Sequence, residues 1–408
     1  MKNILNNLPS SSAQKIYQDK NLQIVIAVTL MAVLGSSSIG PALPALAGDF
    51  KIPPEQIGWV ITAFVVPIAI GTPVSGVLAD RFGRKQILVP ALLLFAGAGC
   101  FCALAQNFRT LLEMRLLQGI GAAPLESLAL TLIGDLYAGK ALTSAMAFNA
   151  GGIGMALVLY PLMSGGLAAL GWRYPFLLPL AAIPVALLVL FCLEIPKFQK
   201  QQEFDFKVYL HNIWCSINNR QVVGLLWAVV ALFILLFGAY FTYIPILASD
   251  TLGASHVTIG IILASMAISL AFVSSQLGLF AQKLSEITLI KVSFVLYALA
   301  LVITPALHNV WLLFIPSFLF GAAHGMVFPS TQALLGGLAP QQYRAGFMAV
   351  NATVLSLGQA LGPLLAGIAF GVWGMQGVFY AGAVFAIATL GLLNLLLARS
   401  SKIQNSRV

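Results

Sequence analysis

Long apolar runs are the feature that most constrains this chain. Twelve of them are long enough to cross the ~30 Å hydrocarbon core of a bilayer, which takes about 20 residues of α-helix. Of the 408 residues, 60% are hydrophobic and only 8% are charged, whereas soluble domains carry about 25% charged residues. The sequence therefore predicts an all-α membrane protein. Its twelve transmembrane helices are expected at 23–47, 57–79, 87–106, 110–133, 142–170, 173–193, 222–247, 257–281, 288–307, 310–335, 344–371 and 376–397.

Basic residues are distributed unevenly among the links that join these runs. With the N-terminus in the cytoplasm, 17 of the 21 Lys and Arg fall on the cytoplasmic side, three fall outside, and Arg115 lies within a helix. Short cytoplasmic loops of membrane proteins carry such an excess of positive charge. We therefore expect a multi-pass protein of the plasma (inner) membrane with both termini in the cytoplasm. Because topology explains the net charge of +9, no nucleic-acid partner is predicted.

The two halves of the chain are related in sequence. With an offset of 202 residues, identical residues recur from the second predicted helix to the fifth. Matches of glycine, proline and asparagine are informative, because they mark backbone or packing requirements that chance matches of Leu or Ala do not. They include Gly58 with Gly260, Gly119 with Gly321, Asn149 with Asn351, Pro161 with Pro363, and Gly165 with Gly367. We expect two pseudo-symmetric six-helix bundles.

Polar segments set the domain boundaries. They give a cytoplasmic tail (1–22), an N-terminal bundle (23–193), a cytoplasmic linker (194–221), a C-terminal bundle (222–397) and a second cytoplasmic tail (398–408). Apolar residues interrupt the charges of the linker, so part of it is expected to lie along the membrane surface. The four cysteines have no metal-ligand spacing with histidines. Neither a metal site nor a disulfide framework is predicted.

A charged link joins the second and third predicted helices. It reads Gly76-Val-Leu-Ala-Asp80-Arg81-Phe-Gly83-Arg84-Lys85. Its glycines permit a sharp turn, and Asp80 can pair with Arg81, Arg84 or a neighbouring helix end. The spacing resembles the loop 2–3 signature of the major facilitator superfamily of secondary transporters, and an ordinary basic loop is the alternative. The resemblance implies two six-helix bundles with a site at their interface, and a cytoplasmic gating motif that latches the outward-open state.

Two further stretches are similar to motifs of the same superfamily. Arg115-Leu-Leu-Gln-Gly119-Ile-Gly121 resembles Arg-x-x-Gln-Gly-x-Gly, whose Arg is implicated in proton transfer. Gly358-Gln-Ala-Leu-Gly362-Pro363-Leu-Leu-Ala-Gly367 resembles the Gly-x-x-x-Gly-Pro-x-x-Gly-Gly motif of bacterial drug:proton antiporters. The copy in the fifth helix is degenerate, with Tyr160 before Pro161 and Ser164 before Gly165. The resemblance implies that these glycines and prolines are helix-packing positions.

Ionisable side chains inside predicted helices are functional candidates, because each costs at least a few kcal/mol at membrane depth. Glu126 follows Arg115 on the fourth helix by close to three turns, so both should face the same way, roughly 16 Å apart. His324 lies on the tenth helix, and the superfamily resemblance implies that the fourth and tenth helices line a central cavity. We expect Arg115, Glu126 and His324 to couple transport to protons. A structural hydrogen bond or simple packing is the alternative for each.

The substrate-binding residues are predicted from side-chain type and position. Phe233, Phe237 and Tyr240 form an aromatic stripe on the seventh helix, and Asn149 and Asn351 are neutral polar groups on the fifth and eleventh. Few charges within the membrane favour an amphiphilic or drug-like substrate over a phosphate or a dicarboxylate. Alternatively, the stripe faces lipid or packs on a neighbouring helix.

Together these features predict a proton-coupled secondary transporter that exports amphiphilic compounds by alternating access. Its expected partners are the small-molecule substrate, protons and the lipid bilayer. The proton gradient is the expected energy source, and no cofactor is expected. The protein is expected to be a monomer. A lipid or glycolipid flippase and an importer of a small metabolite are alternatives on the same fold. No enzyme activity is expected, because no nucleophile–base or metal constellation is recognisable. Tails of about 22 and 11 residues are also short for a sensor with an output domain.

Overall fold

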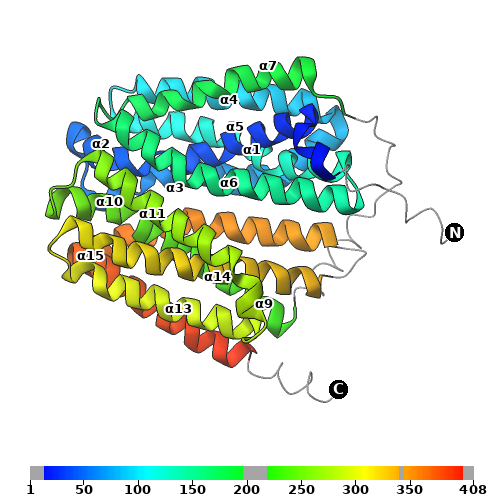
Figure 1. The fold of residues 1–408 in the computed structure, drawn as a ribbon. Helices are drawn as coiled ribbons and strands as arrows, with labels where there is room; N and C mark the ends of the chain where they lie inside the picture. Colours follow the sequence, from blue (N-terminus) through cyan, green and yellow to red (C-terminus); the bar gives the residue numbers. More distant parts are fainter. Residues whose placement is uncertain (1–12, 196–217, 340–343, 398–408) are drawn as a thin grey trace, which may run out of the picture.

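The computed structural model describes residues 13–195, 218–339 and 344–397, so both predicted tails and most of the linker lie largely outside the described residues. The described chain forms two bundles of helices that lie side by side (Figure 1). The long helices of the N-terminal bundle are α1 (Lys20–Ser37), α3 (Trp59–Phe82), α4 (Arg84–Ala103), α5 (Phe108–Leu136), α6 (Gly139–Ala168) and α7 (Ala182–Cys192). Those of the C-terminal bundle are α9 (Arg220–Leu235), α11 (His256–Ser275), α13 (Glu286–Ile303), α14 (Phe314–Leu338) and α15 (Arg344–Leu397).

The twelve predicted membrane-crossing segments are confirmed. In the described residues, 11 helical segments are long and apolar enough to cross a membrane. The last of them, Val350–Leu397, has 48 residues and is long enough to cross twice. α15 is 54 residues long but contains one non-helical residue, Gly374, with φ 68° and ψ −167°. A positive φ of this kind is readily adopted only by glycine. At this residue the chain folds back on itself, so that the orange and red parts of α15 run as two arms (Figure 1).

The first and seventh predicted helices are the most irregular. The first is interrupted after Ser37, and continues as a short 3₁₀ turn (η2, Gly40–Ala42) and α2 (Leu43–Phe50). Pro41 contributes to the break because it has no N–H to donate to the helix. The seventh continues from α9 into a π-helical segment (η5, Leu236–Tyr243), the short α10 (Ile244–Ile246) and a second π-helical segment (η6, Leu247–Thr251). Short π-helical segments are frequent at functional sites.

The remaining elements are short. They are η1 (Ala13–Gln18), η3 (Pro54–Gln56), η4 (Tyr174–Ala181), α12 (Leu277–Ala281), η7 (Thr304–Ala306) and η8 (Val310–Leu313). η4 continues directly into α7, and together they form the sixth predicted helix. α12 follows α11 after Gln276, so the eighth predicted helix is also interrupted near its end.

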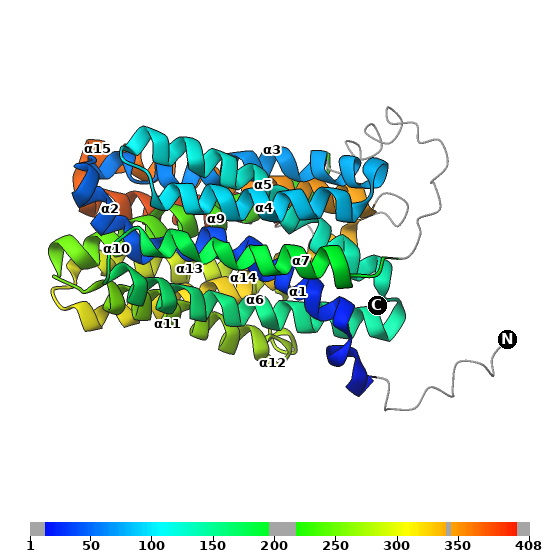
Figure 2. The same cartoon turned by 90° about the horizontal axis from the view of Figure 1, so that it is seen from above.

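The bundles face each other through two pairs of helices. α6 packs against α11, and α3 packs against α15. Seen from above, the two pairs lie on opposite sides of the molecule (Figure 2). This arrangement leaves α1, α5, α9 and α14 to pack between these pairs within their own bundles. A space between the bundles would therefore be bounded by helices of both repeats.

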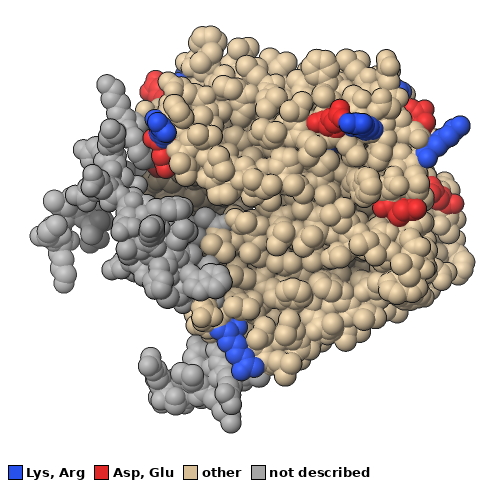
Figure 3. Space-filling model, turned by 180° about the vertical axis from the view of Figure 1, so that it is seen from behind, with Lys and Arg blue, Asp and Glu red and all other residues tan. Residues whose placement is uncertain are grey.

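The molecule has two ends, which we name by the chain. α1 begins and α15 ends at the same end, which we call the terminal end (Figure 1). The opposite end is called the distal end. In the space-filling view, charged side chains gather toward the two ends and most of the surface between them is uncharged (Figure 3). Such a band is what a chain that crosses a bilayer presents to lipid.

Candidate functional site

Two equivalent helix contacts join the bundles near the distal end. At one, Gly58 lies against Pro363 of α15, and a Cβ atom on Gly58 would come within 2.8 Å of the proline Cβ. At the other, Gly260 of α11 lies against Pro161 of α6, and a Cβ atom on Gly260 would come within 2.5 Å of the proline carbonyl oxygen. We call these contacts the Gly–Pro seams. They unite the very residues that the 202-residue offset relates, and each needs glycine because a side chain would overlap the facing helix.

Hydrogen bonds reinforce the same end. In each, a side chain of one bundle contacts a backbone carbonyl oxygen of the other at 3.1 Å. The pairs are Thr62 Oγ1 to Ala360, Tyr243 Oη to Pro54, and His256 Nδ1 to Pro41. The seams and these bonds hold the bundles together at the distal end. In the described structure, the distal end is therefore closed.

At the terminal end, polar contacts join helices of the same bundle. The Tyr137 hydroxyl donates to Asp19 at 2.8 Å, and the backbone N–H of Glu194 donates to Asn21 Oδ1 at 3.0 Å. Burial, together with the hydrogen bond to Asp19, raises the pKa of Tyr137, so its hydroxyl remains a donor at physiological pH. In the C-terminal bundle, Arg220 donates to the carbonyl oxygen of Leu395. These contacts strengthen each bundle without joining the two.

The residues of the charged link lie at the terminal end and contact their own bundle. Gly83 has φ 97° and makes the turn from α3 into α4, a conformation for which glycine is preferred. Arg84 is buried and forms an ion pair with Asp135 of α5, while Asp80 is exposed and attracts the Arg84 guanidinium. Lys85 Nζ donates to the carbonyl oxygen of Leu190 at 3.3 Å.

Part of this link lines a pocket. Its volume is about 520 Å³, and its walls include Asp80, Arg84 and Lys85 from the link and Glu194 after α7. Arg81 lies outside it, with its guanidinium 5.5 Å from the Phe82 ring centre. At Gly76 a Cβ atom would meet nothing within 4 Å, so no close helix contact requires glycine there. The link therefore fastens α3, α4, α5 and α7 to one another.

Arg115 is held inside the N-terminal bundle by neutral oxygen atoms. Its Nε donates to the carbonyl oxygen of Val60 at 3.1 Å, and Nη1 and Nη2 each lie 3.2 Å from the carbonyl oxygen of Gly35. Nη1 also donates to Gln118 Oε1 at 2.7 Å, and the guanidinium lies 4.2 Å from the ring centre of Phe64. The side chain is only 2% exposed. Arg115 thus ties α1 and α3 to α5.

Glu126 is in a different environment, although it lies on the same helix. It is half-buried, and it has no hydrogen bond or ion pair among the described residues. Pro124 lies between it and Arg115 in the sequence of α5. Arg115 is enclosed by its own bundle, whereas Glu126 keeps part of its surface exposed. The expectation that both line one pathway stays a prediction. Among the described residues, Glu126 is thus an acidic group within a long apolar helix that remains available for a ligand or a proton.

His324 lies in an aromatic part of the C-terminal bundle. Its Nδ1 is 3.0 Å from the hydroxyl oxygen of Tyr297 on α13. The ring of Phe233 meets the imidazole edge to face with centres 5.8 Å apart, and Phe328 stacks on it at 5.9 Å. The residue is 7% exposed. His324 is therefore an almost buried imidazole with one hydrogen-bonded nitrogen.

The aromatic stripe of the seventh helix is divided between two surroundings. Phe233 and Phe237 are 7% and 5% exposed, and their ring centres lie 6.3 Å apart. Tyr240 is fully buried in the C-terminal bundle, where it stacks on Phe320 at 4.9 Å and donates to the carbonyl oxygen of Ile262 at 3.2 Å. Its hydroxyl is thus engaged in packing the bundle, whereas the two phenylalanines retain some exposed surface.

The repeat-related asparagines are both buried, and both have an unpartnered oxygen. Asn149 on α6 and Asn351 on α15 are 2% and 4% exposed. Asn351 Nδ2 donates to Gln332 Oε1 at 2.8 Å. In the described structure, no donor reaches Oδ1 of either asparagine. The two amide oxygens are therefore potential acceptors for a ligand.

The remaining predicted packing positions lie at close helix contacts. A Cβ atom on Gly121 would come within 2.6 Å of the Phe95 nitrogen, and one on Gly358 within 2.7 Å of the Val230 carbonyl oxygen. Gly119, Gly165, Gly362 and Gly367 likewise face backbone atoms of a neighbouring helix. Helices approach this closely where small residues meet.

Comparison with known proteins identifies the family. The model of the Major Facilitator Superfamily matches residues 25–302 and 226–407. The chain belongs to this superfamily. It is 26% identical over 398 residues to multidrug resistance protein 2 of Bacillus subtilis (strain 168), covering 93% of this chain and 96% of that protein. It is 24% identical over 358 residues to quinolone resistance protein NorA of Staphylococcus aureus (strain COL), covering 87% and 91%.

A solved transporter has the same fold. It is a bacterial homolog to the human lysosomal transporter Spinster, in an inward-facing and occupied conformation. The TM-score is 0.79 at 18% identity, covering 93% of this chain and 97% of that chain. The two-bundle architecture of the present chain is thus that of a Major Facilitator Superfamily transporter.

The distal face of this superfamily member carries its own polar groups. A pocket of about 920 Å³ is lined by residues that include Asp49, Trp172, Arg173 and His256. Trp172 Nε1 donates to Asp49 Oδ2 at 2.7 Å, and Arg173 Nη1 lies 3.5 Å from the same oxygen. The pocket reaches the bundle interface, since His256 belongs to α11.

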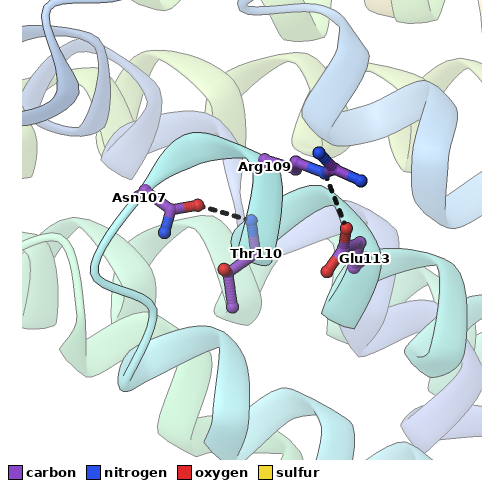
Figure 4. A network of polar contacts seen from close by, with 4 residues as sticks. All are labelled: Asn107, Arg109, Thr110 and Glu113. Carbon is purple, nitrogen blue, oxygen red and sulfur yellow. Dashed lines mark hydrogen bonds and ion pairs between the residues drawn. The ribbon is translucent and has the colours of Figure 1, made fainter.

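The start of α5 lies on the same side of the membrane protein. The Asn107 side chain caps the helix by accepting from the N–H of Thr110 at 2.8 Å, and Arg109 pairs with Glu113 at 3.0 Å (Figure 4). The side chains of this pair are 90% and 52% exposed. An exposed pair of this kind contributes little to stability.

Sequence reasoning missed two residues of the site. Tyr297, the partner of His324, lies 27 residues before it on another helix and belongs to no recognisable motif. Asp135 pairs with Arg84 of the charged link, and the sequence pattern does not reveal this partner. Only the repeat offers a signal for the first of these, since Tyr297 is the counterpart of Phe95, which packs beside Phe64 in the other bundle.

Proposed function

We propose that this transporter exports amphiphilic, drug-like compounds in exchange for protons, with Glu126 as the proton-binding group. The observation that carries this proposal is a carboxyl group on α5, about 15 Å from the end of the helix, that is half-buried and has no partner among the described residues. An acidic group at membrane depth is costly and marks an ion or substrate pathway. The relatives named for drug and quinolone resistance support the export of drugs.

The orientation follows from the basic residues. The positive-inside distribution supports a cytoplasmic location for the terminal end, and the closed distal end would then face outward. In this state Glu126 would release its proton toward the cytoplasm, and its carboxylate would attract the substrate. On the opposite side, protonation would remove the charge and release the substrate. Because the substrate and the proton compete for the Glu126 carboxylate, only one of them is bound at a time. Alternation between the inward-facing and outward-facing states then exchanges one for the other.

Neighbouring groups complete the site. The carbonyl oxygens of Asn149 and Asn351 are candidate acceptors, and Phe233 and Phe237 offer aromatic surface. The proton-transfer role predicted for Arg115 stays a prediction, and its contacts favour a structural role, because its donors are engaged with backbone carbonyls and Gln118. The predicted latch role of Asp80 fits an exposed carboxylate that has been released in the distally closed state.

The test uses purified protein in liposomes with an internal pH dye. A proton gradient is imposed, and lipophilic cations, antibiotics and labelled glycolipids are added in turn. We expect at least one amphiphilic compound to move protons through the wild type and not through Glu126→Gln. Glu113→Gln is the matched control, since it makes the same change on the same helix at an exposed position. It should retain full coupling.

Each alternative has its own outcome. Unchanged proton flux in Glu126→Gln would remove Glu126 from the mechanism. Absence of proton flux with every compound, together with transfer of labelled lipid between leaflets, would replace export by lipid flipping. Uptake in the direction of the proton gradient would replace export by import.

A further inference from the structure

The polar pair His324–Tyr297 is surrounded by aromatic rings. Tyr297 is fully buried, with its ring 4.5 Å from that of Phe320 and 5.9 Å from that of Phe294. Its hydroxyl oxygen lies 3.0 Å from His324 Nδ1. Among the described residues the hydroxyl has no other hydrogen-bond partner. His324 Nδ1 is therefore the acceptor that the Tyr297 hydroxyl proton needs.

That requirement selects one form of the imidazole. A neutral histidine has one nitrogen that donates and one that accepts. If Nδ1 carried the proton, it would donate to the Tyr297 oxygen, and the hydroxyl proton would be left buried without an acceptor, which is costly. If Nε2 carries the proton, the hydroxyl donates to Nδ1 and both groups are satisfied. The geometry thus favours a proton on Nε2 of His324.

Nε2 is the part of the ring that remains available. No described residue accepts a hydrogen bond from it, and His324 keeps 7% of its surface exposed. Phe233 presents its ring at 84° to the imidazole, and Phe328 lies nearly parallel to it at 13°. A single N–H donor between two phenylalanine rings suits an aromatic compound that carries a hydrogen-bond acceptor.

We propose that Tyr297 is a positioning residue that holds His324 as a neutral Nε2–H donor, and that this donor binds the acceptor oxygen or nitrogen of an aromatic substrate. This inference rests on the proposed transport function for its substrate, but not for the state of the imidazole. It separates the roles of the two bundles: Glu126 exchanges the proton, and His324 recognises the compound. His324 then does not take up and release the transported proton, in contrast to the proton-coupling role predicted from the sequence.

The first experiment measures the tautomer directly. Protein with ¹⁵N-labelled histidine in lipid nanodiscs is studied by NMR, and the 4 histidines of the chain are assigned by loss of one signal in His324→Gln. We expect the wild-type His324 to carry its proton on Nε2 across neutral pH. Tyr297→Phe should give a mixture of both tautomers. Tyr240→Phe is the matched control, because it removes a hydroxyl from an equally buried tyrosine that also packs on Phe320 but donates to a backbone carbonyl.

Two results would overturn the assignment. One is a wild-type imidazole with its proton on Nδ1, and the other is a Tyr297→Phe variant with an unchanged tautomer. The measurement needs no transport, so a failure of the proposed exchange mechanism would leave it interpretable.

The second experiment tests recognition. Transport of rhodamine 6G, which has an ester carbonyl, is compared with transport of ethidium, which has none. His324→Phe should raise the KM for rhodamine 6G by about five- to tenfold, the loss expected for one hydrogen bond, and leave that for ethidium nearly unchanged. His324→Gln keeps an N–H donor in a similar place and should restore the KM. Loss of proton flux in His324→Gln would show that His324 carries a proton, and equal effects on both dyes would exclude the acceptor contact; either result overturns the proposal.

Discussion

The cores of the two bundles differ although their helices meet in the same places. In the N-terminal bundle Gly119 of α5 lies against the carbonyl oxygen of Phe64, and in the C-terminal bundle Gly321 of α14 lies against that of Met266. The two contacts are related by the 202-residue offset. Backbone approach is therefore retained in both repeats, as expected where small residues allow helices to pack closely.

The side chains around these contacts have diverged. Arg115 corresponds to Ser317, whose small neutral side chain is fully buried beside the Tyr240 hydroxyl. Phe95 corresponds to Tyr297, which provides the hydroxyl for His324. One bundle thus has a buried cation bound by carbonyl oxygens, and the other has an aromatic cluster with one polar pair. A repeated scaffold can accommodate both, because the glycines set the helix spacing and the larger side chains fill the space that remains.

The largest expected effect comes from removing the cation. Arg115→Met would leave the carbonyl oxygens of Gly35 and Val60 and the Gln118 amide without their donor. Hydrogen bonds to charged groups contribute about 1.5–3 kcal/mol each, so we expect a loss of about 3 kcal/mol or more in the free energy of unfolding. Thermal unfolding of the purified protein in detergent measures it.

The counterpart in the other repeat is the control. Ser317→Ala should change stability by only about 1 kcal/mol, because it removes a single neutral hydroxyl beside Tyr240 and no charged group. Equal effects of the two substitutions would show that the bundles do not differ in the way their contacts indicate.

A conformational effect is expected at the seams. In Gly58→Ala or Gly260→Ala, the added methyl group would overlap the facing proline. Overpacking costs about 1–3 kcal/mol, so the population of the distally closed state should fall by roughly tenfold or more. Distances between spin labels at Gln106 and His308, near the distal ends of the two bundles, should increase when measured by double electron–electron resonance.

The seam prediction has an internal control. Gly151→Ala on α6 adds the same methyl group where nothing lies within 4 Å, so the label distance should not change. Because the two seams are equivalent, either substitution alone should open the distal end. If only one of them does, the symmetry of the closure is incomplete.

The smallest effect is expected for the exposed arginine of α5. Arg109→Gln breaks the pair with Glu113, whose side chains are 90% and 52% exposed. Such pairs contribute less than about 1 kcal/mol and are weakened by salt. In the unfolding assay used for Arg115, this variant should lie close to the wild type. A loss as large as that of Arg115→Met would contradict the distinction between buried and exposed arginines.

The fold could be predicted further than the site. Apolar runs and the repeat predict twelve helices in two bundles, because the bilayer restricts a spanning chain to few solutions. The repeat also identifies Gly58, Pro161, Gly260 and Pro363, although nothing in the offset shows that they touch one another across the interface. This pairing depends on how the bundles face each other, which is a property of the assembled molecule.

The partners of polar side chains were the hardest to predict. Arg115 is bound by backbone carbonyls, and a carbonyl is present at every residue, so no pattern of side chains reveals the partners. Tyr297 reaches His324 from another helix, and partners on different helices have no characteristic spacing in sequence by which they could be recognised. Glu126 is a candidate because an acid within an apolar helix is visible in the sequence itself, and its role stays a prediction.

The Gly–Pro seams have a consequence for the origin of the molecule. In a twofold-symmetric dimer, a residue i of one subunit contacts j of its partner, and j of the first contacts i of the second. The contacts of Gly58 with Pro363 and of Pro161 with Gly260 follow this rule, with the 202-residue offset in place of the second subunit. In a symmetric dimer of six-helix subunits, one type of glycine–proline contact would occur twice, once on each side of the twofold axis. A single such contact would therefore be enough to close the dimer at both places. When two such halves are joined in one chain, their cores can differ while the closure stays symmetric.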